Sequence, residues 1–435
     1  MENAKIVRDW RGRSYLVGPV PSDRTRMLWF ALAAMAAISP LQYGFAGLLA
    51  GEPAGLFALG ACLVCQAAGA LPAIRLLRRG RLPVRAILTF GAALSGLGLL
   101  AVALTGASRP AALLGYAVLG GLGAGAVYGV CAEVVSSWYP ERPAARVGLV
   151  TGAFGYGAVP MLVWAGLAPG ARPAAFTVAA VLAVTAAGAA ARTLRLPPRH
   201  WWPDTVEPRA HALDAAILRR NPVAVRQFGL AQALRTRTLP ALAVILACAG
   251  AVSVFDVVAV AATGSWGALA LMVALNGAGR SMAMRCSEAF GRRRVLATVL
   301  AVLAAGQILL LAALGQATAT GALEAVPVAA PAVGWAQAGG PSLWLGAVAA
   351  GLGGGAFYPL VASLVREFFG VEGGSEIHAV VYSAKAAAAV VAVALALLAL
   401  SAPATALLLA TALAALPALA TPRLRAPGLP ATIPA

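Results

Sequence analysis

The stretch IHAVVYSAKAAAAVVAVALALLAL runs from Ile377 to Leu400 and carries one charged residue, Lys385, which is one of only two lysines in the chain. An apolar helix of this length crosses a hydrocarbon core of about 30 Å at roughly 1.5 Å per residue. Lys385 then lies about 12 Å inside the core, close to its middle. A lysine there costs at least about 2.5–3.5 kcal/mol unless it faces water, protein or an anion. Lys385 is therefore a candidate binding residue.

The composition excludes a soluble protein built on one core. Of the 435 residues, 61% are hydrophobic and 11% are charged, and the mean hydropathy is +0.84. This is more apolar surface than one soluble core can bury, so we predict a polytopic membrane protein whose main partner is the lipid bilayer. The net charge of +18 does not indicate a nucleic-acid partner, because the arginines form short clusters between apolar spans without interleaved aromatic residues.

The sequence carries no signature of cofactor or metal chemistry. It has no Walker-type phosphate loop and no metal-ligand cluster, so we expect no enzyme activity, no cofactor and no metal. The five cysteines lie in or at the end of apolar segments, where thiols usually serve packing.

Twelve apolar segments are long enough to cross a bilayer as helices, and the polar stretch from Arg195 to Thr238 divides them into six and six. The predicted fold class is an all-α polytopic membrane protein with twelve transmembrane helices in two pseudo-symmetric six-helix halves. The expected spans are residues 26–50, 55–77, 84–106, 110–136, 145–168, 173–192, 239–263, 266–288, 294–316, 341–365, 377–400 and 402–420.

The basic residues set the expected orientation. When successive loops are assigned to alternate sides, only Arg109 and Arg172 fall opposite the other clusters. By the positive-inside rule, both termini are cytoplasmic in a multi-pass protein of the cell membrane, residues 195–238 are cytoplasmic and residues 320–338 are external. The expected units are a cytoplasmic N-terminal segment (1–25), a first half (26–192), a cytoplasmic linker (193–238), a second half (239–420) and a cytoplasmic tail (421–435).

An internal repeat supports two related halves. The segment GLGAGAVYGVCAEVVSSWYP (121–140) aligns without gaps on GLGGGAFYPLVASLVREFFG (351–370), with glycines at three shared positions and a tyrosine at the eighth, Tyr128 and Tyr358. Glycine-rich runs alone recur by chance in membrane helices, but the matched tyrosines favour common descent of the halves. Such a repeat implies a transporter with its site between the halves, where Tyr128 and Tyr358 should face one another.

Several further motifs are distinctive. They are Gln42-Tyr43, GLGAGAVYG followed by SSWYPERPAARVGLVTGAFGYGA, QALRTRTLPAL, LNGAGR ending at Arg280, and YSAK ending at Lys385. With these motifs and its six-plus-six plan, the chain resembles the major facilitator superfamily and, within it, the oxalate:formate antiporter family. The arginine and the lysine at these two places are the most specific part of the resemblance.

The resemblance implies that the arginine and the lysine bind the carboxylates of a small anion in a cavity lined by aromatic residues. Carried over by motif, the substrate-binding candidates are Arg280, Lys385, Gln42, Tyr43, Tyr128, Tyr156, Tyr358 and Tyr382. One loop departs from the superfamily, because GALPAIRLLRRGR has Ala73 where an acid is common, while RCSEAFGRRR offers Glu288 in the counterpart loop. Altered gating or a diverged substrate therefore stays open.

Depth in the membrane points to the same pair without the resemblance. Arg280 and Lys385 both lie nearer the middle of their spans than either surface. Two buried cations repel each other, and a bound carboxylate, above all a dicarboxylate, relieves that repulsion. Arginine can hold a carboxylate in a bidentate fork while lysine acts as a point charge. The alternative is a structural ion pair with Asp256, the only acid well inside a span.

Two residues are candidates for carrying a proton. His378 lies two helical turns before Lys385 on nearly the same face, and its alternative is an interfacial position. Asp256 has a capped or water-facing acid as its alternative. A further acid, Glu133, should pair with a loop arginine such as Arg142 or Arg146.

The sequence therefore favours a secondary transporter of small organic anions, oxalate- or formate-like mono- or dicarboxylates, that exchanges them by alternating access. A proton-coupled monocarboxylate symporter is the alternative within transport, and a non-transporting membrane sensor or scaffold is the alternative of another class. The sequence sets no oligomeric state, and we expect a monomer.

Overall fold

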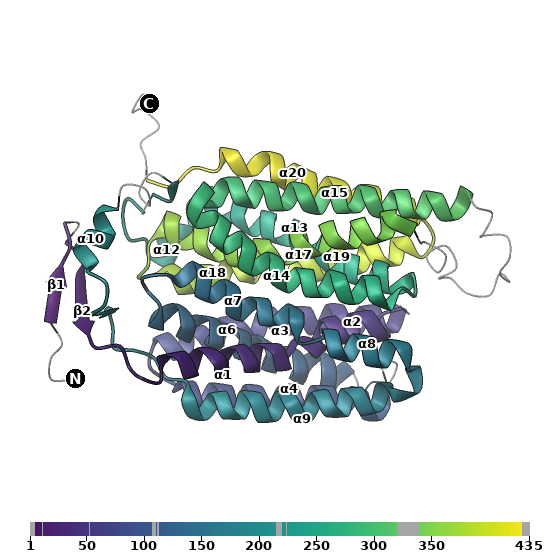
Figure 1. Ribbon diagram of the computed structural model, residues 1–435, viewed down its shortest axis with the longest axis horizontal. Coiled ribbons are helices and arrows are strands. Elements are labelled where there is room, and N and C mark those ends of the chain that lie inside the picture. The colour runs from purple at the N-terminus through teal and green to yellow at the C-terminus, as the bar shows by residue number, and fades with distance from the viewer. Residues whose placement is uncertain are drawn as a thin grey trace.

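The computed structural model describes residues 5–10, 12–51, 53–106, 110, 113–214, 220–222, 224–319 and 340–428. Long helices run roughly parallel to one another, with helices α1 to α9 in one group and α13 to α20 in the other (Figure 1). The predicted external loop at 320–338, the basic residue Arg109 and the last part of the tail lie outside the described residues.

Six segments of the first group span the bundle, and three of them consist of more than one helical piece. In chain order they are α1 (Arg24–Ala37) with η1 (Ser39–Leu41) and α2 (Tyr43–Leu49); α3 (Pro53–Arg78); α4 (Val84–Thr105); η2 (Leu113–Gly120) with α6 (Gly121–Trp138); α7 (Pro143–Tyr156) with α8 (Val159–Leu167); and α9 (Arg172–Thr193), which follows η3 (Pro169–Ala171).

The second group repeats this plan. Its segments are α13 (Thr238–Ala262), α14 (Trp266–Phe290), α15 (Arg292–Ala319), α17 (Gly340–Phe369), α18 (Gly374–Tyr382) with α19 (Lys385–Ala399), and α20 (Pro403–Ala420), which ends in η4 (Thr421–Arg423). Within the described residues, eleven segments are long and apolar enough to cross a bilayer. The segment outside that set is α14, in which Asn276 and Arg280 interrupt the apolar run.

Three segments that the sequence predicts as single helices are broken near mid-length. The first breaks at Gln42, the fifth between Tyr156 and Val159, and the eleventh between Tyr382 and Lys385. Prolines beside the first two breaks remove a backbone donor. At the third, the Ser383 hydroxyl donates to the Val380 carbonyl oxygen over 2.6 Å, the local bond by which serine competes with helix geometry.

The internal repeat corresponds to a repeated packing arrangement. A Cβ built on Gly121 would lie 2.5 Å from the Cys62 carbonyl oxygen of α3, and one on Gly351 would lie 2.5 Å from the Met272 carbonyl oxygen of α14. One turn later, Gly125 meets the Gln66 carbonyl oxygen, and Gly355 meets that of Asn276, equally closely. Glycine therefore lets α6 approach α3, and α17 approach α14, in the same register. This makes Gln66 and Asn276 equivalent positions of the two halves.

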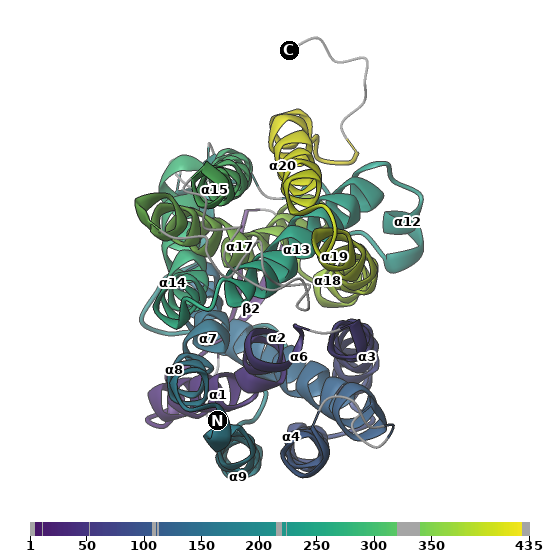
Figure 2. The ribbon, with the colours of Figure 1, turned by 90° about the vertical axis from the view of Figure 1, so that its right-hand side faces the viewer.

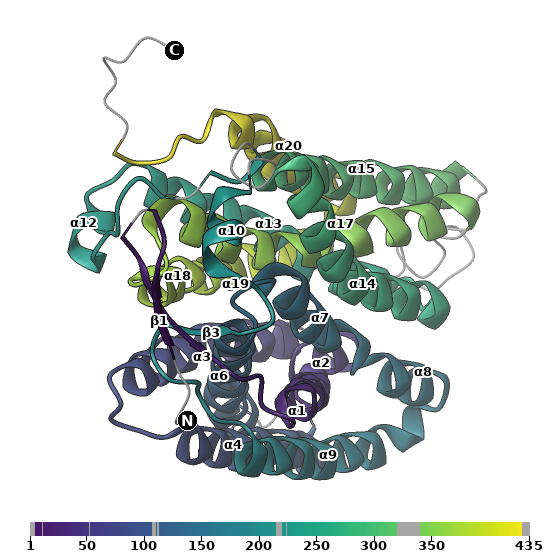
Figure 3. The ribbon, with the colours of Figure 1, turned by 60° about the vertical axis from the view of Figure 1, so that its left-hand side comes forward.

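A small sheet lies at the end of the bundle that carries the N-terminus (Figure 3). Strand β2 (Ser14–Gly18) pairs antiparallel with β1 (Lys5–Arg8) and parallel with β3 (Trp201–Pro203), which comes from the linker. No strand was predicted in the N-terminal segment or in the linker. The linker also forms two short helices, α10 (Pro208–Leu213) and α12 (Leu230–Leu234).

The sheet is fixed to the first group of helices through Arg24 and the residues that follow α6. Arg24 donates from Nε to the Trp138 carbonyl oxygen over 2.8 Å, and it pairs with Glu141 at 2.5 Å. Its guanidinium lies 3.9 Å from the Tyr139 ring centroid. The Trp138 ring in turn packs edge-on against Trp201 of β3.

Candidate functional site

A cluster of polar and aromatic side chains lies between the two groups of helices. Figure 2 shows α2, α6 and α7 of the first group beside α14, α17 and α19 of the second. A narrow cavity at this interface is lined by Gln42, Tyr128, Phe154, Arg280, Tyr358, Tyr382 and Lys385. Both cations come from the second group.

Arg280 reaches from α14 across to the first group and is 1% exposed. Its Nη1 donates to the Thr151 carbonyl oxygen of α7 over 3.0 Å. Its Nη2 donates to the Tyr43 hydroxyl over 3.0 Å and to Asn276 Oδ1 over 3.1 Å. The Nε has no hydrogen-bond partner among the described residues. One donor of the guanidinium fork is thus available to a ligand.

Lys385 is the first residue of α19 and is 3% exposed. Its Nζ donates to Gln42 Oε1 over 2.8 Å, to Gln66 Oε1, and over 3.5 Å to the Tyr382 hydroxyl. Both glutamines belong to the first group of helices. The break between α18 and α19 places Tyr382 and Lys385 on either side of one short turn, so both side chains reach the same cavity.

Neither cation has a carboxylate partner in the described part of the chain. Six ion pairs are found there, and none includes Arg280 or Lys385. Asp256, the acid of the alternative structural ion pair, instead accepts a hydrogen bond from Gln307 Nε2 over 2.7 Å. Two buried positive charges are therefore held only by neutral oxygen acceptors, an arrangement that leaves a strong attraction for an anion.

Aromatic rings surround the two cations. The Phe154 centroid lies 5.6 Å from the Arg280 guanidinium and 5.9 Å from Lys385 Nζ, and the Tyr358 ring lies 5.5 Å and 5.7 Å from the same groups. Tyr382 stacks on Tyr128 at 5.5 Å and lies 6.2 Å from Tyr358. The two tyrosines of the repeat therefore line one cavity with Tyr382 in contact with both. The Tyr358 hydroxyl has no hydrogen-bond partner among the described residues.

The structure does not bring every candidate into the cluster. Tyr156 is 41% exposed, and its ring lies against Gly277 of α14. Phe154, two residues earlier on α7, occupies the cavity instead, because two residues turn a helix by about 200°. His378 is half-buried on α18 with its ring 6.0 Å from Tyr382, outside the residues that line the cavity.

Three residues at the site were missed from the sequence: Gln66, Phe154 and Asn276. Gln66 and Asn276 each offered a signal, since uncharged amides inside apolar spans are uncommon and tend to be functional. Asn276 also lies one turn before Arg280. Phe154 offered no signal beyond its place in the FGYGA motif.

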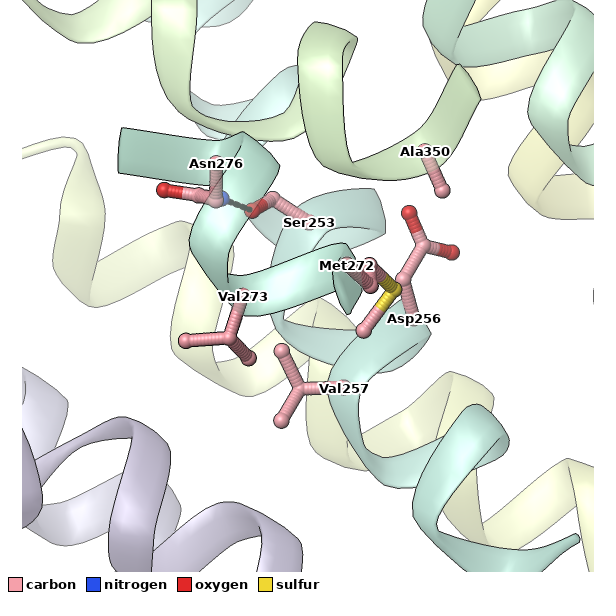
Figure 4. A pocket seen from close by; sticks show the side chains of 7 residues that line it. All are labelled: Ser253, Asp256, Val257, Met272, Val273, Asn276 and Ala350. Atoms are coloured by element: carbon pink, nitrogen blue, oxygen red, sulfur yellow. Dashed lines mark hydrogen bonds between the residues drawn. The ribbon is translucent and has the colours of Figure 1, made fainter. Parts of the chain in front are cut away.

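A second cavity lies among helices of the second group. Figure 4 shows its lining residues, which come from α13, α14 and α17: Ser253, Asp256, Val257, Met272, Val273, Asn276 and Ala350. Asn276 belongs to both regions, because its Oδ1 accepts from Tyr43 and Arg280 while its Nδ2 donates to Ser253 Oγ over 3.5 Å.

A charged cluster connects the two groups of helices at the end where α3 and α17 finish. Glu133 of α6 pairs with Arg78 of α3 and lies 4.0 Å from Arg366 of α17. The prediction that Glu133 pairs with Arg142 or Arg146 is wrong, because its ion pair is with Arg78 at the end of α3, and Arg366 is the next arginine to it. Arg366 also donates to the Ser136 hydroxyl over 2.8 Å. Arg366 and Ser136 are equivalent positions of the internal repeat, so equivalent positions of the two halves meet here.

This architecture defines a class: a multi-pass integral membrane protein whose two six-helix groups enclose a polar site. Two solved structures are similar to it. One is a POT family transporter in complex with 5-aminolevulinic acid, with a TM-score of 0.62 and 11% identity over 92% of this chain and 96% of that chain. The other is the human organic anion transporter MFSD10 (TETRAN), with a TM-score of 0.53 and 16% identity over 92% of this chain and 100% of that chain.

These likenesses confirm the predicted fold, an all-helical polytopic bundle of the major facilitator type. No family model and no curated protein matches the chain.

Proposed function

We propose that this protein is a secondary transporter of small carboxylate anions that works by alternating access. The observation that carries the proposal is the pair Arg280 and Lys385, two buried cations with no carboxylate partner among the described residues. Buried charges that persist in a membrane protein usually face a partner or a substrate. Both cations also lie where the two halves meet, the usual place for a site that is opened alternately to each side.

The geometry suits an anion with one or two carboxylates. Arginine binds a carboxylate through parallel donors, and here Nε is free while Nη2 is shared between two neutral acceptors. The ammonium of Lys385 is held by two glutamine oxygens that a carboxylate can replace. Aromatic rings line the cavity with the two cations, and we propose oxalate- or formate-like anions as its ligands. One structure that shares the fold is described as an organic anion transporter, in agreement with this substrate class.

The orientation follows from the positive-inside rule, with both termini and the linker cytoplasmic in the cell membrane. The charged cluster of Glu133, Arg78 and Arg366 then closes the cytoplasmic side. Rocking of the halves breaks this cluster when the site opens inward and reforms it when the site opens outward.

Exchange of one anion for another is the first candidate for the transport mode. A vacant site with two neighbouring cations is costly, and an incoming anion offsets that cost before the halves move. Proton-coupled symport of a monocarboxylate is the second candidate, and the buried Asp256 favours it. A non-transporting sensor or scaffold is the alternative of another class, and it would bind the anion without moving it.

Counterflow in proteoliposomes tests the proposal. Purified protein is reconstituted, and labelled mono- and dicarboxylates from formate and oxalate to succinate are offered against an internal excess of the same anion. Uptake of at least one of them supports transport, whereas binding without counterflow would favour the sensor.

Substitution of Lys385 tests the site. We expect Lys385→Ala and Lys385→Gln to abolish uptake while the melting temperature stays near that of the wild type, because each removes a buried charge that has no ionic partner. A saturating anion at about 100 times its Kd stabilises a binding-competent protein by about 2.7 kcal/mol, so the wild type should show a thermal shift that these variants lack.

Two further variants complete this test, one that keeps the charge and one that serves as a control. Lys385→Arg keeps the charge on a larger, planar group, and altered selectivity is expected. Lys5→Ala removes the other lysine, in the exposed strand β1, and serves as the matched control with normal uptake. Normal uptake by Lys385→Ala would refute the assignment.

A further inference from the structure

Asp256 is a buried acid that the anion site does not use. It lies on α13, is 1% exposed, and accepts one hydrogen bond, from Gln307 Nε2 of α15 to its Oδ1 over 2.7 Å. Its Oδ2 has no hydrogen-bond partner and no cation within ion-pair distance among the described residues. An ionised carboxylate is costly in such surroundings, whereas a carboxylic acid that carries a proton is not. The surroundings of Asp256 therefore favour a bound proton.

Polar side chains lie between the cavity beside Asp256 and the anion site. Asp256 and Ser253 lie one turn apart on α13 and line the same cavity (Figure 4). Ser253 accepts from Asn276 Nδ2, and Asn276 Oδ1 accepts from Arg280. Asn276 thus lines the cavity of the acid and contacts the guanidinium of the anion site.

Asn276 also contacts the interface between the two groups. Its Oδ1 accepts a hydrogen bond from the Tyr43 hydroxyl of the first group over 2.9 Å. Separation of the halves would break this bond, and Asn276, which lines the second cavity, would then lie at the edge of the opened site. Such an opening would bring solvent closer to the cavity that Asp256 lines.

The elements packed against α13 carry further titratable or charged groups. They are Arg280, Arg285, Cys286 and Glu288 on α14, Lys385 on α19, Tyr358, Arg366 and Glu367 on α17, Tyr43 on α2 and Glu376, His378 and Tyr382 on α18, with Arg292, Arg293 and Arg294 at the start of α15. None of them forms a described hydrogen bond or ion pair with Asp256. Arg280 is hydrogen-bonded to Asn276, which lines the same cavity as Asp256.

We propose that Asp256 is a proton-binding site, and that a proton on Asp256 and a carboxylate at Arg280 and Lys385 bind cooperatively and are carried together. This inference rests on the proposed function. The direction of the effect of Asp256 on anion affinity follows from charge. An ionised Asp256 repels the bound anion and partly compensates the charge of Arg280, whereas a protonated Asp256 does neither. Protonation therefore strengthens anion binding, and by linkage anion binding strengthens protonation.

Binding of two probes across pH tests the coupling. Formate serves as the monocarboxylate and oxalate as the dicarboxylate, above the pH range in which each probe itself titrates. We expect the wild-type affinity to fall about tenfold or more towards alkaline pH, within the range typical of coupled sites. In Asp256→Asn, which keeps the shape and an acceptor for Gln307 but cannot ionise, the affinity should stay at the low-pH value throughout.

Transport provides the second readout. A pH gradient, acidic outside, should drive accumulation by the wild type, whereas Asp256→Asn should retain counterflow exchange and lose the accumulation. The matched control is Glu367→Gln, which neutralises another buried acid, one that is paired with Arg292 at 2.9 Å, and should leave the pH response intact. Lys385 and His378 remain in Asp256→Asn, so a pH dependence that survives this substitution belongs to them and overturns the proposal.

Infrared spectroscopy separates this proposal from the proposed function. The carbonyl band of a protonated carboxylic acid should be present in the wild type near neutral pH without any anion and absent from Asp256→Asn. A spectrum in which the two proteins do not differ overturns the proton site. Failure of the wild type to bind either probe would remove the coupling together with the proposed function, whereas the infrared band would still decide whether Asp256 holds a proton.

Discussion

The two groups of helices meet through different side chains at the two ends of the bundle. At the end where α3 and α17 finish, here called the linker end, they meet through charged side chains. At the opposite end they meet through glycines and large apolar side chains. At the linker end, Glu133 lies between Arg78 and Arg366, and Arg78 also donates to the Ser375 hydroxyl over 2.8 Å. These contacts connect α3 and α6 with α17 and α18.

The opposite end has no described ion pair between the groups. There a Cβ built on Gly166 of α8 would clash with the Trp266 ring of α14, and one on Gly60 of α3 would lie 2.8 Å from Val393 of α19. Similarly, Gly47 of α2 lies against Leu269 of α14. Shape rather than charge closes this end.

The two ends of the bundle therefore differ in what must be broken for each of them to open. Ion pairs at the linker end exchange their partners for water at modest net cost, because Arg78 is 39% exposed and Arg366 is 28% exposed. The apolar end loses its contacts outright when it opens, and any added atom at its glycines prevents it from closing. Substitutions should therefore act on one end at a time.

The largest effect is expected from Glu133→Gln, which leaves two arginines without their acid. Breaking a fully buried pair costs about 3–5 kcal/mol; the partial exposure of the arginines reduces this to about 2–3 kcal/mol. The linker end should open more often. Thiol labelling of Ala379→Cys, which is 1% exposed in the closed structure, measures this in a background without the five native cysteines. Glu207→Gln, at an exposed acid just before α10, is the control, and equal labelling in both variants would contradict the role of the cluster.

A somewhat smaller effect is expected at the opposite end from Gly166→Leu. Overpacking against the Trp266 ring costs about 1–3 kcal/mol, so this end should remain open, uptake should fall and anion binding should persist. Leu269→Cys, fully buried in the closed structure, should become accessible to thiol reagents. Gly188→Leu on α9, where an added Cβ meets nothing within 4 Å, should behave as the wild type. Unchanged labelling in Gly166→Leu would show that the Trp266 ring moves aside instead.

The smallest effect is expected from Arg79→Ala at the linker end. Arg79 is 58% exposed and lies 3.8 Å from Glu376, and exposed pairs contribute about 0–1 kcal/mol. Uptake and Ala379→Cys labelling should stay near wild-type values. A loss as large as that of Glu133→Gln would mean that the pair on the rim, rather than the buried acid, holds the linker end closed.

The sequence predicted most of the bundle, because transmembrane helices satisfy their own backbone and can be recognised from local apolar runs. Arg280 and Lys385 were found for the same reason, since a charge within such a run is conspicuous. The neutral partners of these two cations were harder to predict from the sequence. Gln42 was predicted from a motif. Gln66 on α3 is 319 residues from Lys385 in the sequence and contacts it only through the packing of the two groups.

Three outcomes depended on tertiary contacts that no local pattern contains. Phe154 rather than Tyr156 faces the cavity because of how α7 is rotated against α14. Glu133 pairs with Arg78 of α3 and lies 4.0 Å from Arg366 across the interface, rather than with the next loop. Strand β3 has three residues, too few to give an alternating pattern, and it becomes a strand only because β2 lies beside it.

The sheet also constrains the order in which the polypeptide can assemble during synthesis. Strand β2 is made before all the helices of the first group, but its partner β3 follows α9, the last helix of that group. The complete sheet can therefore form only after all six spans of that group have been made, and it can form before the second group exists. Because domains generally fold as units during synthesis, N-terminal first, pairing of β2 with β3 would mark the completed first half.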